Sequence, residues 1–193
     1  AAGIDPKDIV VVSIMPCTAK KFEAQRPEMC ASGFRDVDYV LTTREVGRMI
    51  REAGIDFVNL PDETFDAPMG EYTGAATIFG ATGGVMEAAL RTVYAVVTGE
   101  NLQSLDVTPV RGLDGVKEAA LEVGGLGKVK VAVAHSMANA RKILDKIRAG
   151  EADWAFVEFM TCPGGCIAGG GGPIPTTNEI RMLRSGALYA DDS

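Results

Sequence analysis

The sequence predicts an α/β fold in which a mainly parallel β-sheet is flanked by helices. Three observations support this fold class: short apolar runs rich in β-branched residues, helical periodicity between those runs, and a strand–helix–strand succession late in the chain. The two strands of such a unit pair in parallel, because the crossover helix returns the chain to the same end of the sheet. Without an internal repeat or a linker, residues 1–193 are expected to form one domain.

The first third of the chain contains two predicted strands and a predicted helix. Residues 9–14 are apolar and mostly β-branched, which is typical of a strand covered on both faces. A second strand is expected over residues 37–41. Thr42 and Glu45 then match a capping box, which predicts a helix that ends before Gly54.

The middle of the chain is less regular. Residues 56–59 are expected to form a short strand, and residues 61–77 a long irregular stretch, since prolines and glycines recur there. Residues 85–97 have the apolar density of a helix buried on most sides, which Gly99 ends. Strands are expected near residues 107–110.

The strand–helix–strand unit is predicted at residues 128–134, 138–149 and 154–157. The chain ends just past a further apparent helix and begins almost directly in a strand. We therefore expect it to be a fragment of a longer chain.

Charge and hydropathy exclude several classes of protein. The net charge is -7 and no dense Lys/Arg run occurs, so nucleic acids and anionic membranes are not expected partners. No apolar run approaches the roughly 20 residues that span a bilayer. No targeting segment is visible either, and the cytoplasm is the expected location, with the periplasm as the alternative.

The cysteines carry the chemical signal of the sequence. Cys17 follows the first predicted strand, and Cys162 and Cys166 flank Pro-Gly-Gly after the last one. Because ligands gather at the carboxyl ends of parallel strands, the three sulfurs are expected to meet at one inorganic centre. A Pro-Gly-Gly turn aims two sulfurs together and leaves backbone N–H groups for the sulfides of a cluster. The glycines at 169–172 allow backbone to lie against a bulky group.

Other interpretations of these residues remain open. All four cysteines could form a structural zinc site: Cys17, Cys30, Cys162 and Cys166. Outside such a site, Cys30 is expected to be an ordinary, partly buried side chain. His135, the one histidine, is expected to make local hydrogen bonds.

Two segments resemble signature motifs of the iron-only (FeFe) hydrogenases. They are residues 15–23, Met-Pro-Cys-Thr-Ala-Lys-Lys-Phe-Glu, and residues 158–173, Glu-Phe-Met-Thr-Cys-Pro-Gly-Gly-Cys-Ile-Ala-Gly-Gly-Gly-Gly-Pro. Residues 35–44 and 78–91 are also similar to that family, so the resemblance covers essentially the whole chain. It implies the C-terminal half of the catalytic domain of the large subunit.

The resemblance implies a specific cofactor, the H-cluster. This is a 4Fe-4S cubane joined through one cysteine sulfur to a diiron unit that carries CO, cyanide and a bridging azadithiolate. By the resemblance, Cys17 and Cys162 bind the cubane and Cys166 bridges it to the diiron unit.

The same resemblance assigns roles to residues near the cysteines. Lys20 would donate hydrogen bonds to a cyanide, and Glu23 would orient Lys20, although both read otherwise as surface charges. Met15 and Met160 would pack against the diiron unit, although methionines are usually core fillers. Phe79 would line the same pocket. It precedes the glycine-rich residues 80–84, whose more usual role is helix–strand packing.

The sequence departs from the family pattern in two places. The motif Thr-Ser-Cys-Cys-Pro, which supplies the fourth cubane ligand and a proton-carrying cysteine, does not occur, and Gly172 replaces the usual glutamine before Pro173. A missing N-terminal part of the domain, or a companion subunit, is therefore an expected partner, and catalysis by the isolated chain is in doubt.

The implied activity of the parent enzyme is the reversible interconversion of dihydrogen with protons and electrons. Ferredoxin or another electron carrier is the expected redox partner. The alternative is a non-catalytic iron-sulfur protein, such as a hydrogen sensor or a relative that acts in cluster assembly.

Overall fold

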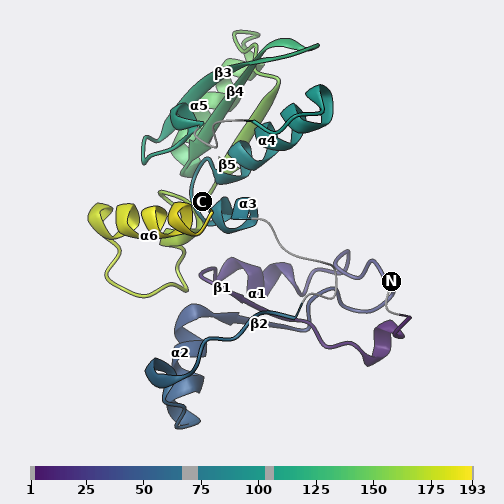
Figure 1. Ribbon diagram of the computed structural model, residues 1–193, viewed down its shortest axis with the longest axis vertical. Helices are drawn as coiled ribbons and strands as arrows, with labels where there is room; N and C mark the ends of the chain where they lie inside the picture. Colours follow the sequence, from purple (N-terminus) through teal and green to yellow (C-terminus); the bar gives the residue numbers. More distant parts are fainter. Residues whose placement is uncertain (1–2, 67–73, 103–106, 193) are drawn as a thin grey trace. The chain divides into compact units, whose positions relative to one another are not determined.

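A computed structural model describes residues 3–66, 74–102 and 107–192 of the chain. The chain divides into two compact units (Figure 1). The first unit comprises Ala1–Tyr72 and Gly169–Pro175, and the second comprises Thr73–Ala168 and Thr176–Ser193. Each unit is described by itself.

The first unit is built on a two-stranded parallel sheet. Strand β1 (Val12–Met15) pairs with β2 (Tyr39–Thr42), with Val12 opposite Tyr39. Two helices accompany the strands, α1 (Ala19–Glu23) and α2 (Thr43–Glu52), together with the 3₁₀ turns η1 (Pro6–Asp8) and η2 (Phe57–Asn59). Both strands and the helix predicted after Thr42 are confirmed.

The capping box at the start of α2 forms as predicted. The Thr42 hydroxyl accepts a hydrogen bond from the Glu45 N–H at 3.2 Å, and Glu45 Oε2 accepts one from the Thr42 N–H at 2.8 Å. Lys21 Nζ lies 2.9 Å from the same carboxylate oxygen. The Thr42 N–H and Lys21 lower the pKa of Glu45 to about 2, so its carboxylate stays ionised at the helix N-terminus.

Two expectations for the first unit are wrong. Strand β1 is not covered on both faces, because Val12 is 48% and Ile14 60% exposed. Among the described residues, β2 is the one strand that pairs with it. Residues 57–59 form a 3₁₀ turn instead of a strand. Of the predicted irregular stretch, residues 67–73 lie outside the described residues.

The second unit contains a three-stranded sheet in the order β3-β4-β5. Strand β3 (Val116–Val123) is antiparallel to β4 (Gly127–His135), and β4 is parallel to β5 (Phe156–Met160) across helix α5 (Met137–Arg148). The predicted strand–helix–strand unit is therefore confirmed. The remaining elements are α3 (Gly74–Thr77), η3 (Ile78–Gly80), α4 (Gly84–Thr98), η4 (Thr108–Val110), η5 (Cys166–Ala168) and α6 (Asn178–Asp191).

Helices cover both faces of this sheet (Figure 1). Val131 and Val133 of β4 pack in one cluster with Met86 and Leu90 of α4. The alternate residues of β4, represented by Ala132, pack in a second cluster with Ile143 of α5. Since successive side chains of a strand point to opposite faces, the two clusters form two sides of the core.

The sheet departs from the mainly parallel arrangement at β3. Its sequence, Val-Lys-Glu-Ala-Ala-Leu-Glu-Val, is rich in helix-favouring residues, which conceals a strand. Gly125 and Gly127, both with positive φ, form the turn to β4. Residues 108–110 form a 3₁₀ turn and not a strand, because Pro109 lacks the N–H that a sheet needs.

A buried charge network joins α6 to α4. Glu87 is fully buried and accepts hydrogen bonds from Arg91 and, at 2.9 Å to Nε, from Arg111. Arg91 Nη1 also donates to Asp192 at 2.9 Å, and this guanidinium lowers the pKa of the Asp192 carboxyl. The network compensates the burial of Glu87 with two cations. Among the described residues, no helix has the length and apolarity needed to cross a membrane.

The capping box generates a prediction about stability. Replacing Thr42 with Ala removes the acceptor for the Glu45 N–H and is expected to lower the free energy of unfolding by about 1 kcal/mol, measured by urea denaturation. Thr43→Ala is the matched control, since Thr43 is exposed at the next position and makes no cap. Equal losses in the two variants would contradict the role of the cap.

The buried network generates a second prediction. Glu87→Leu leaves two guanidinium groups without their shared carboxylate and is expected to cost about 3–5 kcal/mol in the free energy of unfolding. Glu100→Leu, at an exposed position after the same helix, should change it by less than about 0.5 kcal/mol. A loss below about 1 kcal/mol for Glu87→Leu would show that the carboxylate is not needed.

Candidate functional site

The cysteine loop, residues Cys162–Cys166, follows directly on strand β5 in the second unit. The Gly165 N–H donates to the Cys162 carbonyl at 3.0 Å, which closes a tight turn between the two cysteines. Gly164 and Gly165 have φ of +87° and +98°, a region that L side chains rarely adopt. The predicted non-helical turn is thus present, and η5 begins at Cys166.

The cysteine loop packs against a second glycine-rich segment, the glycine loop, residues Gly80–Gly84. The Thr82 N–H donates to the Gly164 carbonyl at 3.0 Å. A Cβ on Gly165 would lie 2.6 Å from the Thr82 nitrogen, so the two main chains touch directly. The sequence favoured helix–strand packing for the glycine loop, whereas the structure makes it the support of the cysteine loop.

Met160 and Phe79 flank these two loops. Met160 is the last residue of β5, two positions before Cys162, and the Ser136 N–H donates to its carbonyl at 2.8 Å. Phe79 lies in η3 at the start of the glycine loop and is 46% exposed, so its ring is accessible. Both predicted residues therefore lie on the segments that carry or support the cysteines of the second unit.

The first unit holds the other half of the predicted site. Met15 ends β1, and Cys17 lies in the short connection to α1. Lys20 Nζ donates to Glu23 Oε1 at 2.6 Å, so these two side chains are in contact. Met15, Lys20 and Glu23 line one pocket of about 210 Å³, together with Met29 and other residues of this unit. Three predicted side chains are thereby brought together.

The glycine run, residues Gly169–Gly172, belongs to the first unit. The Gly171 N–H donates to the Pro16 carbonyl at 3.0 Å, and its carbonyl accepts from the Arg44 N–H at 3.2 Å. A Cβ on Gly171 would lie 2.5 Å from Thr42 Cγ2. Gly171 therefore needs to lack a side chain, because its backbone lies against Thr42 and is bonded to Pro16, the residue before Cys17.

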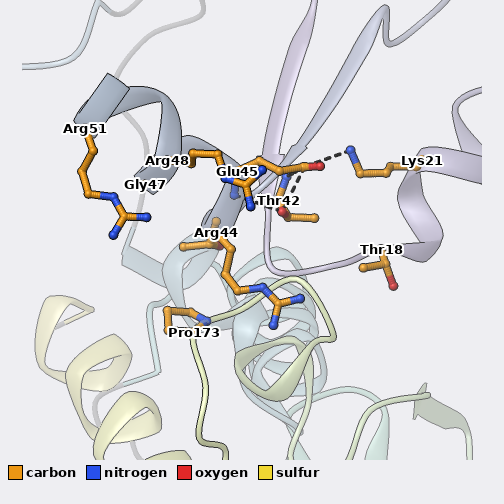
Figure 2. A pocket seen from close by; sticks show the side chains of 10 residues that line it. Thr18, Lys21, Thr42, Arg44, Glu45, Gly47, Arg48, Arg51 and Pro173 are labelled. Atoms are coloured by element: carbon orange, nitrogen blue, oxygen red, sulfur yellow. Dashed lines mark hydrogen bonds and ion pairs between the residues drawn. The ribbon is translucent and has the colours of Figure 1, made fainter. Parts of the chain in front are cut away.

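A larger pocket, of about 620 Å³, opens beside the glycine run (Figure 2). Figure 2 shows Arg44, Arg48 and Arg51 of α2 extending along it, with Thr18 and Pro173 on its rim. Arg44 Nη2 donates to the Gly170 carbonyl at 2.8 Å. The basic lining was not predicted, because the arginines are dispersed among polar residues in the sequence.

The remaining candidate ligands lie apart from these loops. Cys30 is exposed, contrary to the expected partial burial, and its Sγ lies 2.9 Å from the Pro27 carbonyl. His135 is buried, with its ring nitrogens 3.1 Å from the Leu113 carbonyl and 3.2 Å from the Ser136 hydroxyl, which confirms a local role. No group of three or more His, Cys, Asp or Glu side chains suited to a metal is found among residues 3–66, 74–102 and 107–192.

Two buried charges near the cysteine loop escaped the sequence analysis. Glu158 is 6% exposed and interrupts the apolar strand β5, which was a visible signal. Lys117 is 6% exposed in β3, the strand that was not predicted. Burial lowers the pKa of Lys117 to about 8, against the opposing effect of Glu158, so its ammonium group is still charged at neutral pH.

Comparisons with known proteins agree with the sequence resemblance. The family model "Iron only hydrogenase large subunit, C-terminal domain" matches residues 1–170. The periplasmic [Fe] hydrogenase large subunit of Nitratidesulfovibrio vulgaris is 56% identical over 187 residues, covering 96% of this chain and 44% of that protein. Cytosolic iron-sulfur assembly component 3 of Mus musculus is 32% identical, over 94% of this chain and 39% of that protein.

A solved structure is also similar. HydA(deltaEFG), whose structure concerns stepwise [FeFe]-hydrogenase H-cluster assembly, matches with a TM-score of 0.76 and 42% identity over 98% of this chain and 55% of that chain. The α/β fold is therefore that of the FeFe hydrogenases. This chain spans less than half of the hydrogenase large subunit named above. It belongs to the iron-only hydrogenase large subunit family, within the C-terminal domain.

Proposed function

We propose that this chain provides part of an H-cluster site, with Cys17, Cys162 and Cys166 as ligands. The observation that carries the proposal is the bond from the Gly171 N–H to the carbonyl of Pro16, the residue before Cys17. Cys166 precedes Gly171 by five residues, a length of chain that spans at most about 18 Å. We propose that this short covalent connection would allow Cys166 and Cys17 to bind the same group.

The residues present fit an iron-sulfur group. Three thiols are a suitable donor set, and Gly164 and Gly165 place main chain without side chains beside two of them. Lys20 adds a cation that would offset the negative charge of the thiolates. The all-thiolate zinc site would need Cys30 as its fourth ligand, and Cys30 is exposed, with its Sγ 2.9 Å from the Pro27 carbonyl.

The surrounding residues would bind and shield the group. Cys17, Cys162 and Cys166 would hold the H-cluster, which when bound would supply the reversible interconversion of dihydrogen with protons and electrons. Lys20 would donate hydrogen bonds to it, held by Glu23 at 2.6 Å. Met15, Met160 and Phe79 would present apolar surface that excludes water.

The rest of the catalytic domain completes the proposal. The sequence lacks the motif Thr-Ser-Cys-Cys-Pro, so we expect the fourth cubane ligand and the proton-carrying cysteine from the remaining part of the domain or from a companion subunit. The two units described above would then belong to one catalytic domain of the enzyme. Ferredoxin or a related carrier would exchange the electrons.

A cytoplasmic location is proposed for the protein, although one relative is named as periplasmic. Cell fractionation decides between the two compartments.

A non-catalytic iron-sulfur protein is the second candidate function. It is favoured by the 32% identity to cytosolic iron-sulfur assembly component 3, over 94% of this chain. Hydrogen turnover by the complete parent protein, compared with its cluster content, separates the candidates. A protein that holds its cluster and neither produces nor consumes dihydrogen would be the assembly or sensor type.

The ligand assignment predicts metal content. After anaerobic reconstitution of the 193-residue chain with iron and sulfide, Cys17→Ser, Cys162→Ser and Cys166→Ser are each expected to retain less iron than the unaltered chain, measured by elemental analysis. Cys30→Ser, the matched control, should retain the same amount. Binding of zinc in place of iron, with loss of zinc on Cys30→Ser, would refute the assignment.

The bridging role of Cys166 predicts a more specific loss in the complete enzyme. Cys166→Ala should remove the infrared absorption of the CO and cyanide ligands and abolish hydrogen turnover, because the proposed link to the diiron unit would run through this sulfur. Cys30→Ala should keep both signals. Retention of turnover by Cys166→Ala would show that this cysteine is not the bridge.

A further inference from the structure

One peptide group of the glycine loop is bound at both ends by buried charged side chains. Lys117 Nζ donates to the Thr82 carbonyl at 3.0 Å. The Gly83 N–H donates to Glu158 Oε1 at 2.7 Å. The Thr82 carbonyl and the Gly83 N–H belong to the same peptide group, so a cation binds its oxygen and an anion binds its N–H. We call this arrangement the peptide clamp.

The charges of the clamp match the peptide dipole. The carbonyl oxygen carries partial negative charge and faces an ammonium, while the N–H carries partial positive charge and faces a carboxylate. Thr82, Lys117 and Glu158 are all at most 6% exposed, so water does not compete for these bonds. Reversing this peptide group would break both bonds at once.

Each charged side chain of the clamp also makes a second hydrogen bond to the backbone. Lys117 Nζ also donates to the Gly112 carbonyl at 2.9 Å, and Glu158 Oε2 accepts from the Met86 N–H at 2.8 Å. Gly83, the N-cap residue of α4, has φ of +92° and no room for a side chain, since a Cβ would lie 1.9 Å from the Val110 carbonyl oxygen. Glu158 therefore supplies the cap that Gly83 cannot make itself.

The clamp acts on the peptide group next to the one that holds the cysteine loop. The Thr82 N–H donates to the Gly164 carbonyl, and the Gly165 backbone lies against Ala81 and Thr82 without space for a methyl group. A change in the Thr82 backbone would therefore be transmitted directly to the turn between Cys162 and Cys166. Neither charged side chain belongs to the proposed ligand set.

We infer that Lys117 and Glu158 are positioning residues, which fix the Thr82–Gly83 peptide group and through it hold the cysteine loop in the conformation that presents both sulfurs. The inference rests on one part of the proposed function, namely that the sulfurs bind an iron-sulfur group. The two side chains also bring opposite charges to the environment of that group. Their effects on loop order are thus alike, whereas their effects on its reduction potential are opposite.

The experiment combines two measurements on the full chain. Amide hydrogen exchange, without iron, reports the order of the loops, and the reduction potential of the reconstituted 4Fe-4S cluster reports the charges. The variants are Lys117→Met and Glu158→Gln. The matched controls are Lys128→Met and Glu118→Gln, because Lys128 and Glu118 are exposed charges on the same β3–β4 hairpin.

The clamp predicts a local loss of order. In both variants, protection of the Thr82 and Gly165 amides should fall about tenfold or more, while that of Val131 and Val133 in the core of β4 should be unchanged. The potential should move to more negative values in Lys117→Met and to more positive values in Glu158→Gln. Neither measurement should move in the controls.

A further variant separates hydrogen bonding from charge. Lys117→Gln retains a neutral donor, so it is expected to restore part of the protection without restoring the potential. If Lys117→Met does not fold, Lys117→Gln and Glu158→Gln together still test the inference. Wild-type protection of Thr82 and Gly165 in folded variants, or shifts of the potential in the same direction in both, would overturn the inference. Failure of both the unaltered chain and the complete parent protein to bind iron would refute the proposed function instead, and the exchange measurement would still decide on the clamp.

Discussion

Direct contact between main chains is the constraint on which the candidate site depends. In the second unit, the Thr82 N–H binds the Gly164 carbonyl, and Gly165 lies so close to Thr82 that no Cβ fits. In the first unit, Gly171 binds Pro16 in the same manner, against Thr42. Such contacts position a cysteine through its backbone and do not use its thiol. They also explain why glycines crowd around the cysteines.

Buried charged side chains stabilise both the fold and the contacts around the cysteine loop. The chain is acidic overall, yet its buried charges are individually paired or hydrogen-bonded: Glu87 with two arginines, and Lys117 and Glu158 with backbone groups. A buried charge without such partners would be costly. The first network joins two helices, whereas the second fixes the backbone under the cysteine loop. The need of buried charges for partners thus stabilises the fold at Glu87 and fixes the geometry of the site at Lys117 and Glu158.

Strand β1 of the first unit is more exposed than its composition predicts. Strand β1 has the composition of a strand buried on both faces, but Val12 and Ile14 are about half exposed in the unit. The chain covers only 44% of the hydrogenase large subunit with which it shares 56% identity. An apolar strand exposed in this way is expected where further parts of a catalytic domain would pack, in keeping with the partner proposed above.

Local patterns in the sequence were sufficient for much of the fold and for the family. The capping box at Thr42, the parallel pairing of β4 with β5 and the motifs around Cys17 and Cys162 depend on residues close together in the chain, so they could be predicted. Strand β3 could not, because alanines and charges favour a helix until the hairpin with β4 imposes a strand.

Only the tertiary structure decided how the site is supported. It brought the glycine loop beneath the cysteine loop and placed Lys117 and Glu158 at the two ends of one peptide group, although Glu158 lies 75 positions from Gly83 in the sequence. The physical reason is that these bonds form between segments that packing brings together, and the spacing of residues along the chain does not specify that packing. The sequence by itself determined which residues are chemically capable, and the packed backbone determined which of them act together.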